Sequence, residues 1–295
     1  MRLAKVLIWV IPLLWTVNGV IARKAPGVIT PNVLALGRWA VAGVVLAFLA
    51  RSELWRNRSV LRAQWRHYLV LGACGMWICG AWVYLAGRST EMMNISLIYA
   101  ASPVMIAIGS VLWMGERFSR RQLLGVVLAI GGVVHVVVQG KWLRLSDVHW
   151  VPGDLWIAGA ATAWAAYALL QKRWPAKLGS SAHLAATCAG GVVVLLPFAV
   201  WEMVQVNTPA LGTNAALMVA LAALVPGLGA YWIYGWTQKL LGASRVAMTL
   251  YLGPLYSALV SWLFLGEQLG WHHLVGGLLI LCGVALVVAT ARNVP

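Results

Sequence analysis

Long apolar runs alternate with short polar segments that hold nearly all of the charged residues. Four of the runs contain no charged residue at all: 92–115, 178–201, 246–266 and 268–291. A helix needs about 20 apolar residues to cross the core of a lipid bilayer. The pattern therefore predicts ten membrane-spanning helices, at about 4–22, 31–50, 67–87, 91–114, 121–139, 153–171, 180–201, 214–237, 243–265 and 271–291.

Two of these spans need an argument of their own. Residues 203–238 form one uncharged stretch, and its first part, Gln205 to Asn214, is rich in turn-forming residues. This predicts a loop before a single helix, although a second helix there would raise the number of spans to eleven. The first run resembles a secretory signal, but Arg23 and Lys24 follow it instead of a cleavage site, so we expect it to be a span.

Composition agrees with a membrane protein, because 62% of the residues are hydrophobic and only 10% are charged. Soluble domains are about one quarter charged. The net charge of +15 could suggest nucleic acid, but the Lys and Arg residues stand in short segments between apolar runs. Loops at a cytoplasmic membrane surface have this pattern. We therefore expect the lipid bilayer as a partner and no nucleic acid.

The loop charges also predict the orientation. With the N-terminus inside, 16 basic residues fall on the cytoplasmic side, five fall on the other side, and Arg38 is left within a span. The cytoplasmic set is Arg2, Lys5, Arg51, Arg56, Arg58, Arg62, Arg66, Arg117, Arg120, Arg121, Lys172, Arg173, Lys177, Lys239, Arg245 and Arg292; the opposite set is Arg23, Lys24, Arg88, Lys141 and Arg144. The positive-inside rule then predicts both termini in the cytoplasm.

The chain contains an internal repeat. At a constant offset of 151, Pro103 aligns with Pro254, and Gly115-Glu116 aligns with Gly266-Glu267; 13 of the 35 positions from 103 to 137 are identical. A shorter match at offset 149 pairs Trp15 with Trp164. An offset of five spans is odd, so the second copy starts on the other side of the membrane. We therefore expect an all-α integral membrane protein whose ten transmembrane helices form two inverted five-helix repeats, residues 1–147 and 148–295.

Inverted repeats are typical of secondary transporters, which bind substrate in a central cavity between the halves. A structural duplication without transport is the alternative. At this point the residues resemble a known family: "LLWTVNGVIARK", "LALGRWAVAG", "AATAWAAYALLQKRW" and the paired "P…GE" segments are similar to the EamA family of the drug/metabolite transporter superfamily. The resemblance covers essentially the whole chain. It implies ten helices, inverted halves and a central cavity. Among members, the many Trp residues and the opening look most like the bacterial aromatic amino acid exporters, which implies the inner membrane of a bacterium.

A first group of candidate cavity residues lies in the first, second and sixth spans. Arg38 could attract a substrate carboxylate, or it could cap carbonyls or extend toward the membrane interface. Trp15 and Asn18 share one face of the first span, and Trp164 and Tyr167 repeat that spacing in the sixth. Inverted copies of one face would meet at a central cavity, although Trp is also common in interfacial belts.

A second group lies in the third, fourth, eighth and ninth spans, where rings could form an aromatic pocket or face lipid. It comprises Trp77, Gly80, Tyr84, Tyr99, Tyr231, Tyr234 and Tyr251. Pro103 and Pro254 interrupt the fourth and ninth spans at matched depths, and each predicts either a hinge for alternating access or a rigid kink.

The acidic residues argue against a proton pump and against catalysis. None of the seven lies at the centre of a span, and Glu116 and Glu267 fall at opposite membrane faces, where we expect them to pair with loop cations or hold helix ends. Proton-driven pumps usually need an intramembrane carboxylate or His chain. There is also no Walker A motif and no Cys or His at metal-ligand spacing. We expect no cofactor, no metal and no enzymatic activity.

Together these features predict a monomeric secondary transporter for small metabolites. Arg38 stands nearly alone as an intramembrane cation, which disfavours a nucleotide-sugar carrier, and the aromatic candidates favour export of aromatic or hydrophobic amino acids by facilitative alternating access. The alternatives are an efflux carrier for drugs or other metabolites, a membrane-embedded enzyme, which would need a cluster of His, Asp or Glu at one interface, and a structural or receptor-like bundle.

Overall fold

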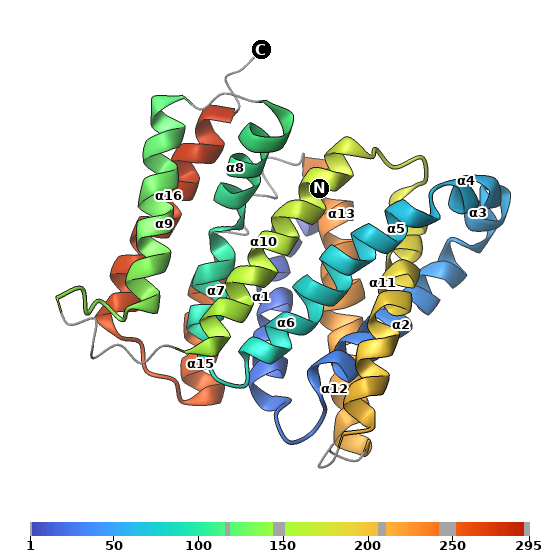
Figure 1. Cartoon of the computed structure of the whole chain (residues 1–295), viewed down its shortest axis with the longest axis horizontal. Helices are drawn as coiled ribbons and strands as arrows, with labels where there is room; N and C mark the ends of the chain where they lie inside the picture. Colours follow the sequence, from blue (N-terminus) through green and yellow to red (C-terminus); the bar gives the residue numbers. More distant parts are fainter. Residues whose placement is uncertain (1, 116–118, 144–150, 206–210, 242–251, 292–295) are drawn as a thin grey trace.

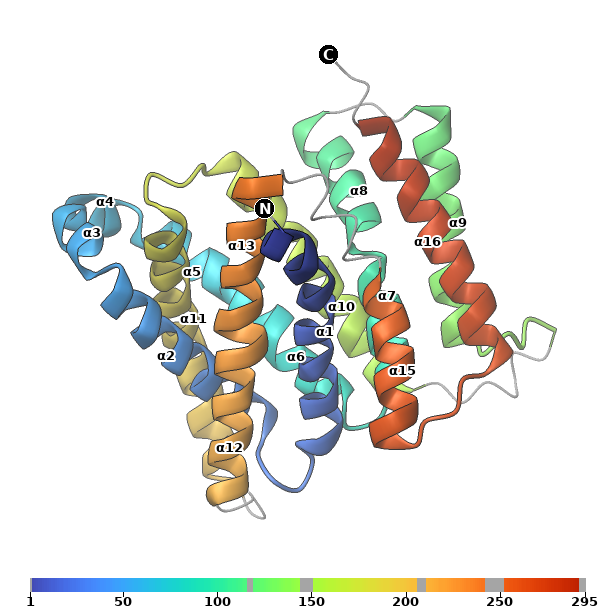
Figure 2. The same ribbon diagram turned by 180° about the vertical axis from the view of Figure 1, so that it is seen from behind.

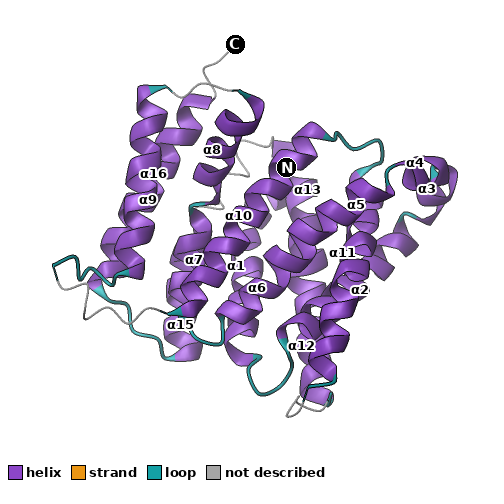
Figure 3. Cartoon of the chain, in the orientation of Figure 1, coloured by secondary structure: helices purple, strands orange, loops and turns teal. Residues whose placement is uncertain are grey.

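The computed structural model describes residues 2–115, 119–143, 151–205, 211–241 and 252–291. Within these ranges the chain is built from helices and turns, with no β-strand (Figure 3). The absence of strands follows from the bilayer as solvent, because a helix pairs its own backbone groups and leaves none exposed to lipid.

The helices divide between the two halves of the chain. The first half contains α1 (Arg2–Lys24), α2 (Pro31–Leu49), α3 (Arg51–Arg56), α4 (Arg58–Ala63), α5 (Trp65–Gly72), the π-helical segment η1 (Ala73–Ile78), α6 (Cys79–Ala86), α7 (Met92–Ala100), α8 (Ser102–Met114) and α9 (Arg120–Val137). The second half contains α10 (Pro152–Arg173), α11 (Ser180–Met203), α12 (Thr213–Ala222), the π-helical segment η3 (Ala223–Gly229), α13 (Ala230–Leu241), α15 (Gly253–Leu265) and α16 (Trp271–Ala291).

In the described part of the chain, six helical segments are long and apolar enough to cross a membrane. They are Pro31–Leu49, Trp65–Ala86, Met92–Met114, Arg120–Val137, Ser180–Met203 and Thr213–Tyr234, and two shorter apolar helices are Gly253–Leu265 and Trp271–Val287. Each of the ten predicted ranges contains described helix, although the ninth is described only from Leu252 onward. The full ten-span topology stays a prediction.

The bundle has two opposite ends (Figures 1 and 2), and the residues at them differ in charge. We call the end that carries α3, α4 and the segment between α10 and α11 the basic face, because five Arg residues lie between Arg51 and Arg66. We call the opposite end the acidic face. It carries the loops at 25–30, 87–91 and 266–270, together with Glu91, Asp154, Glu202 and Glu267.

Two close helix pairs lie at opposite sides of the bundle, α9 with α16 and α2 with α11 (Figure 1). In the first pair, glycines let the backbones approach each other. A Cβ added to Gly125 would lie 2.6 Å from the carbonyl oxygen of Gly283, and one added to Gly132 would lie 2.8 Å from that of Gly276. Small residues at such crossings are typical of helix packing in membranes, where close backbone contact replaces the hydrophobic driving force.

Helix α5 crosses α11 at an even tighter point. A Cβ on Gly72 would overlap the backbone of Gly191, and a Cβ on Gly190 would overlap the carbonyl of Tyr68. We expect Gly72→Ala to lower the free energy of unfolding by about 1–3 kcal/mol, because overpacking a well-packed contact costs that much. Thermal unfolding in detergent, followed by Trp fluorescence, measures the change.

The matched control is Gly131→Ala in α9. A Cβ at Gly131 meets no other atom within 4 Å, and Ala favours helix over Gly by about 1 kcal/mol, so this variant should be as stable as the parent chain or more so. Equal destabilisation by both substitutions would contradict close packing at Gly72.

Candidate functional site

A cavity of about 310 Å³ lies between α1, α2, η1, α6, α7, α8, α10, α13 and α15. Seven of the predicted cavity residues line it: Trp15, Asn18, Arg38, Gly80, Tyr99, Trp164 and Tyr231. Pro103 and Pro254 line it as well. The volume is at the lower end of the range of small-molecule sites, roughly 300–1,000 Å³.

Arg38 in α2 is the charged centre of the cavity wall, with only 5% of its surface exposed. Its Nη1 donates to Asn18 Oδ1 (2.9 Å) and to the hydroxyl oxygen of Tyr84 (3.2 Å), and that hydroxyl donates in turn to Asn18 Oδ1 (2.9 Å). The guanidinium carbon lies 4.4 Å from the centroid of the Trp39 ring. These partners are all neutral, so the charge of Arg38 is solvated without being neutralised.

One donor of Arg38 is not satisfied. Its Nε is buried and has no hydrogen-bond partner among the described residues. An unpaired buried donor costs about 1–3 kcal/mol, and a buried charge without a counter-ion costs more. Unsatisfied buried groups are few in native proteins, so this one marks Arg38 for a role other than stability.

Aromatic rings form much of the remaining wall. The Trp15 ring meets Tyr231 edge to face, with centroids 5.9 Å apart, and Tyr231 also contacts Trp39 at 6.5 Å. Tyr99 and Trp164, from α7 and α10, have centroids 6.5 Å apart. This wall suits an apolar or aromatic group, because ring edges and faces offer favourable contacts beyond area burial.

Four other predicted residues do not line the cavity. Tyr84 lies behind Asn18 and Arg38 and orients them, and Tyr234 packs against Trp15 with ring centroids 5.6 Å apart. Tyr167 is buried against Gly75, and Trp77 stacks on Phe198 and donates to Asn32 Oδ1 (3.2 Å). Tyr251 lies outside the described residues. Direct substrate contact stays a prediction for all of the candidates.

The fourth span is broken at Pro103, and this break shapes the cavity. Helix α7 ends at Ala100 and α8 begins at Ser102. Proline has no N–H, so the carbonyl of Tyr99 loses its helical donor, and Ser102 Oγ donates to that carbonyl instead (2.5 Å). Pro254 stands in the first turn of α15. Movement at either proline stays a prediction.

Several lining groups are not apparent in the sequence. Cys79 Sγ lies 2.7 Å from the Tyr99 hydroxyl, and Thr16 and Ser96 also reach the cavity. The π-helical segments η1 and η3 bring Gly75 to the wall and Gly227 beside Arg38 Nε. π-Helical turns are frequent at functional sites; Pro226 inside η3 is a sequence signal for one of them, and η1 has no such signal.

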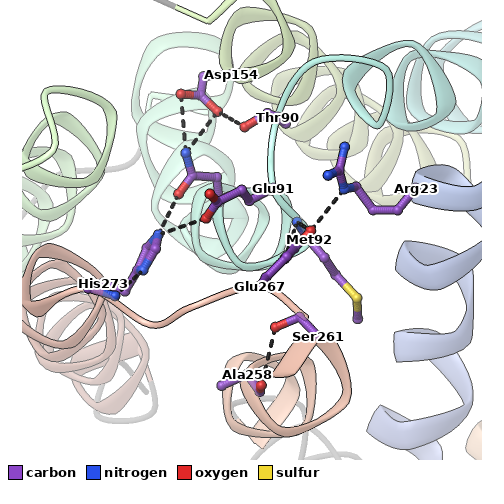
Figure 4. Close-up of polar contacts among 11 residues, drawn as sticks. Arg23, Thr90, Glu91, Met92, Asp154, Ala258, Ser261, Glu267 and His273 are labelled. Atoms are coloured by element: carbon purple, nitrogen blue, oxygen red, sulfur yellow. Dashed lines mark hydrogen bonds and ion pairs between the residues drawn. The ribbon is translucent and has the colours of Figure 1, made fainter. Parts of the chain in front are cut away.

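A polar network lies at the acidic face, where it includes the cavity-lining residue Met92 (Figure 4). Glu267 accepts a hydrogen bond from Arg23 Nε (2.8 Å) and from the backbone N–H of Met92 (3.0 Å). Arg23 Nη1 also donates to the carbonyl of Gly87 (2.9 Å). One carboxylate therefore joins the ends of α1, α7 and α15.

The network continues toward α10 and α16. Asp154 accepts from Thr90 Oγ1 and from Asn94 Nδ2, and His273 Nε2 lies 3.0 Å from Asn94 Oδ1 (Figure 4). Partial burial and the neighbouring Glu267 raise the pKa of Glu91, against the opposing effect of Arg23. Among the described residues, no group of three or more His, Cys, Asp or Glu side chains is placed to hold a metal ion.

Three glutamates share one structural role, because each accepts an N–H at the start of another helix. Glu267 does so at α7, Glu202 accepts from the backbone N–H of Asn32 at α2 (2.8 Å), and Glu53 accepts from Gly179 before α11 (2.6 Å). A carboxylate is stabilising at a helix N-terminus, where donors are unpaired and the dipole is positive. The prediction that Glu267 pairs with a loop cation or holds a helix end is confirmed for the helix end, while its cation, Arg23, lies in the last turn of α1. Glu116 lies outside the described residues.

Comparison with known proteins assigns the family. The model of the EamA-like transporter family matches the chain twice, at residues 3–138 and 151–289. The chain belongs to this family. It is a multi-pass membrane transporter, and its substrate is a small molecule.

The relatives agree with this assignment, and a solved structure agrees with the fold. The chain is 25% identical to the "Uncharacterized transporter YyaM" of Bacillus subtilis, covering 90% of this chain and 86% of that one. It is 28% identical to the "Probable terminal-alkyne amino-acid exporter" of Streptantibioticus cattleyicolor, over 86% and 82%. A crystal structure of another protein matches with a TM-score of 0.61 and 21% identity over 99% of both chains, which supports the fold.

Proposed function

We propose that this transporter exports amino acids, with aromatic or hydrophobic ones preferred, by facilitative alternating access. The observation that carries the proposal is Arg38, a buried cation with neutral partners, set in a wall of aromatic rings. A carboxylate would supply the counter-ion of the guanidinium, and the rings would accept the apolar side chain. The exporter of Streptantibioticus cattleyicolor, whose name states an amino-acid substrate, adds support.

We further propose that residues 1–147 and 148–295 form two inverted five-helix halves. The offset of 151 relates Gly125 to Gly276 and Gly132 to Gly283. If each residue of the contact between Gly125 and Gly283 is replaced by its partner in the repeat, the contact between Gly276 and Gly132 results. The structure contains both contacts. Exchange of this kind is expected around a two-fold axis between α9 and α16. The two matches of the family model support the same division.

The basic face is assigned to the cytoplasm of a bacterial inner membrane, together with both termini. The support is the clustering of Arg51, Arg56, Arg58, Arg62 and Arg66 at that end, while Glu91, Asp154, Glu202 and Glu267 lie at the other. Anionic lipid headgroups attract such an arginine cluster at the cytoplasmic leaflet.

Facilitative transport is favoured because no Asp, Glu or His belongs to the described lining of the cavity. The buried carboxylates Asp154, Glu202 and Glu267 are hydrogen-bonded at the acidic face instead. A proton-driven carrier would usually need such a group along the substrate path.

Reconstitution into liposomes tests the substrate. Vesicles loaded with unlabelled L-phenylalanine should take up labelled L-phenylalanine, L-tryptophan and L-methionine faster than protein-free vesicles, and a labelled nucleotide sugar should stay at the protein-free rate. Equal entry of all four solutes, or of none, would overturn the proposal.

The same vesicles test the energy source. In the absence of a substrate gradient, an imposed pH gradient of either sign should produce no accumulation of L-phenylalanine above the external concentration, since the described cavity lining holds no Asp, Glu or His to carry a proton. Collapsing the gradient with an ionophore should leave the exchange rate unchanged. Uphill uptake driven by the pH gradient would show proton coupling instead.

A further inference from the structure

We infer that the cavity recognises the carboxylate and the apolar side chain of its substrate and leaves the α-ammonium group unrecognised. Monocarboxylic acids that lack an amino group are then substrates as well. The inference rests on the proposed function, because it divides the recognition of an amino acid into groups that the wall contacts and one group that it does not contact.

Recognition of the substrate carboxylate follows from the donors of Arg38. The two hydrogen bonds of Nη1 go to Asn18 and Tyr84, which are neutral, while Nε is buried without a partner. Tyr84 and Trp39 hold the guanidinium from two sides, so its position is fixed before a ligand arrives. Preorganised, charge-assisted hydrogen bonds of guanidinium to carboxylate are among the strongest that proteins use.

The lack of recognition of the ammonium group follows from the acceptors in the wall. An ammonium group has three donors and no acceptor, so its recognition needs several oxygens and is favoured by a carboxylate. No acidic residue belongs to the described lining, and its hydroxyl acceptors, Thr16, Ser96 and Ser257 among them, carry no negative charge. Asn18 Oδ1, the acceptor beside Arg38, already accepts from both Arg38 and Tyr84. The carboxylate of Glu267, at the acidic face, is held by Arg23 and the Met92 N–H.

The positive charge of the wall also disfavours recognition of the ammonium group. With Arg38 as the charged residue among the described lining residues, the wall carries one positive charge. An ammonium that enters with its carboxylate is repelled by the guanidinium and gains no opposite charge, whereas a monocarboxylate gains the attraction alone. The face of Trp39 is covered by Arg38, so this ring offers an ammonium no cation–π contact.

The rest of the wall defines the body of the ligand. Trp15, Tyr99, Trp164 and Tyr231 face a volume of about 310 Å³, which suits one aromatic or branched apolar group beside the carboxylate. The structure thus points to aryl and alkyl monocarboxylates as the ligand class, with amino acids as the members that carry an additional amine.

Three compounds with one phenyl ring separate the contributions: L-phenylalanine, 3-phenylpropionate without the amine, and 2-phenylethylamine without the carboxylate. Purified full-length protein in nanodiscs is titrated with each at neutral pH by calorimetry. The dissociation constant of 3-phenylpropionate should equal that of L-phenylalanine or be lower, and that of 2-phenylethylamine should be at least tenfold higher. In liposomes loaded with L-phenylalanine, 3-phenylpropionate should inhibit the exchange of labelled L-phenylalanine more strongly than 2-phenylethylamine does.

Each outcome decides a different point. Binding of L-phenylalanine without 3-phenylpropionate, or equal binding of the amine, would overturn the inference and leave amino-acid transport in place. Binding of 3-phenylpropionate without L-phenylalanine would remove the amino-acid assignment and keep carboxylate recognition. Binding of none of the three compounds would overturn both. Arg88→Gln, which removes an exposed cation outside the cavity lining, is the control for general charge and should bind all three as the parent chain does.

Discussion

Arg38→Gln is expected to lower the rate of carboxylate exchange by at least tenfold, the largest functional effect of any single substitution in this chain. Glutamine keeps a neutral amide donor near Asn18 and Tyr84 but removes the positive charge and the Nε donor. A charge-assisted hydrogen bond contributes about 1.5–3 kcal/mol, which corresponds to roughly 10- to 150-fold in affinity. Initial rates of labelled L-phenylalanine exchange in liposomes measure the loss.

Arg38→Lys separates charge from geometry. Lysine keeps the charge but has neither the planar fork nor the contact with the face of Trp39 in the same form. We expect it to recover part of the exchange that Arg38→Gln loses, with a raised KM. If Arg38→Gln transported at the parental rate with unchanged KM while remaining folded, Arg38 would have a structural role alone.

Glu267→Ala is expected to lower the free energy of unfolding by about 2–4 kcal/mol. Glu267 is 8% exposed and serves two helices besides its own, through Arg23 and the N–H of Met92. Removing it leaves a partly buried cation and a buried backbone donor without their partner, and each loss is costly. The melting temperature in detergent, read from the fluorescence of the 18 Trp residues, reports the change.

Glu53→Ala is the matched comparison, since Glu53 accepts the N–H of Gly179 at a solvent-exposed helix start. An exposed cap is typically worth about 1 kcal/mol, so this variant should lose less stability than Glu267→Ala. The double variant Arg23→Ala/Glu267→Ala should be less destabilised than the sum of the single variants, because the two side chains contact each other. Full additivity would contradict the ion pair.

Features with a strong one-dimensional signal could be predicted from the sequence. The helices follow from uncharged apolar runs, and the break before Pro103 follows from a residue that lacks an N–H. Trp15, Asn18 and Trp164 could be placed at the cavity because the repeat relates the first and sixth spans and the spacing of three keeps side chains on one face. The ten-span, inverted arrangement is still a proposal, with the paired glycine contacts in its support.

Features that depend on the rotation of one helix against another could not be predicted. Trp77 and Tyr84 lie in one span, yet one stacks on Phe198 away from the cavity and the other stands behind Asn18. Trp77 lies inside the π-helical segment η1, which shifts the phase of the helix ahead of Tyr84, so a regular 3.6-residue period assigns their directions incorrectly. The hydrogen bonds that Glu53, Glu202 and Glu267 accept at helix starts likewise could not be predicted, because each joins residues more than 100 positions apart.

The two caps on the pair α2 and α11 have a mechanical consequence. Glu53, just after α2, holds the start of α11 at one membrane face, and Glu202, near the end of α11, holds the start of α2 at the other. Sliding one helix along the other by a single turn, about 5.4 Å, would break both fastenings at once. We therefore expect α2 and α11 to move together as one rigid unit, with any rocking of the bundle taking place around this pair.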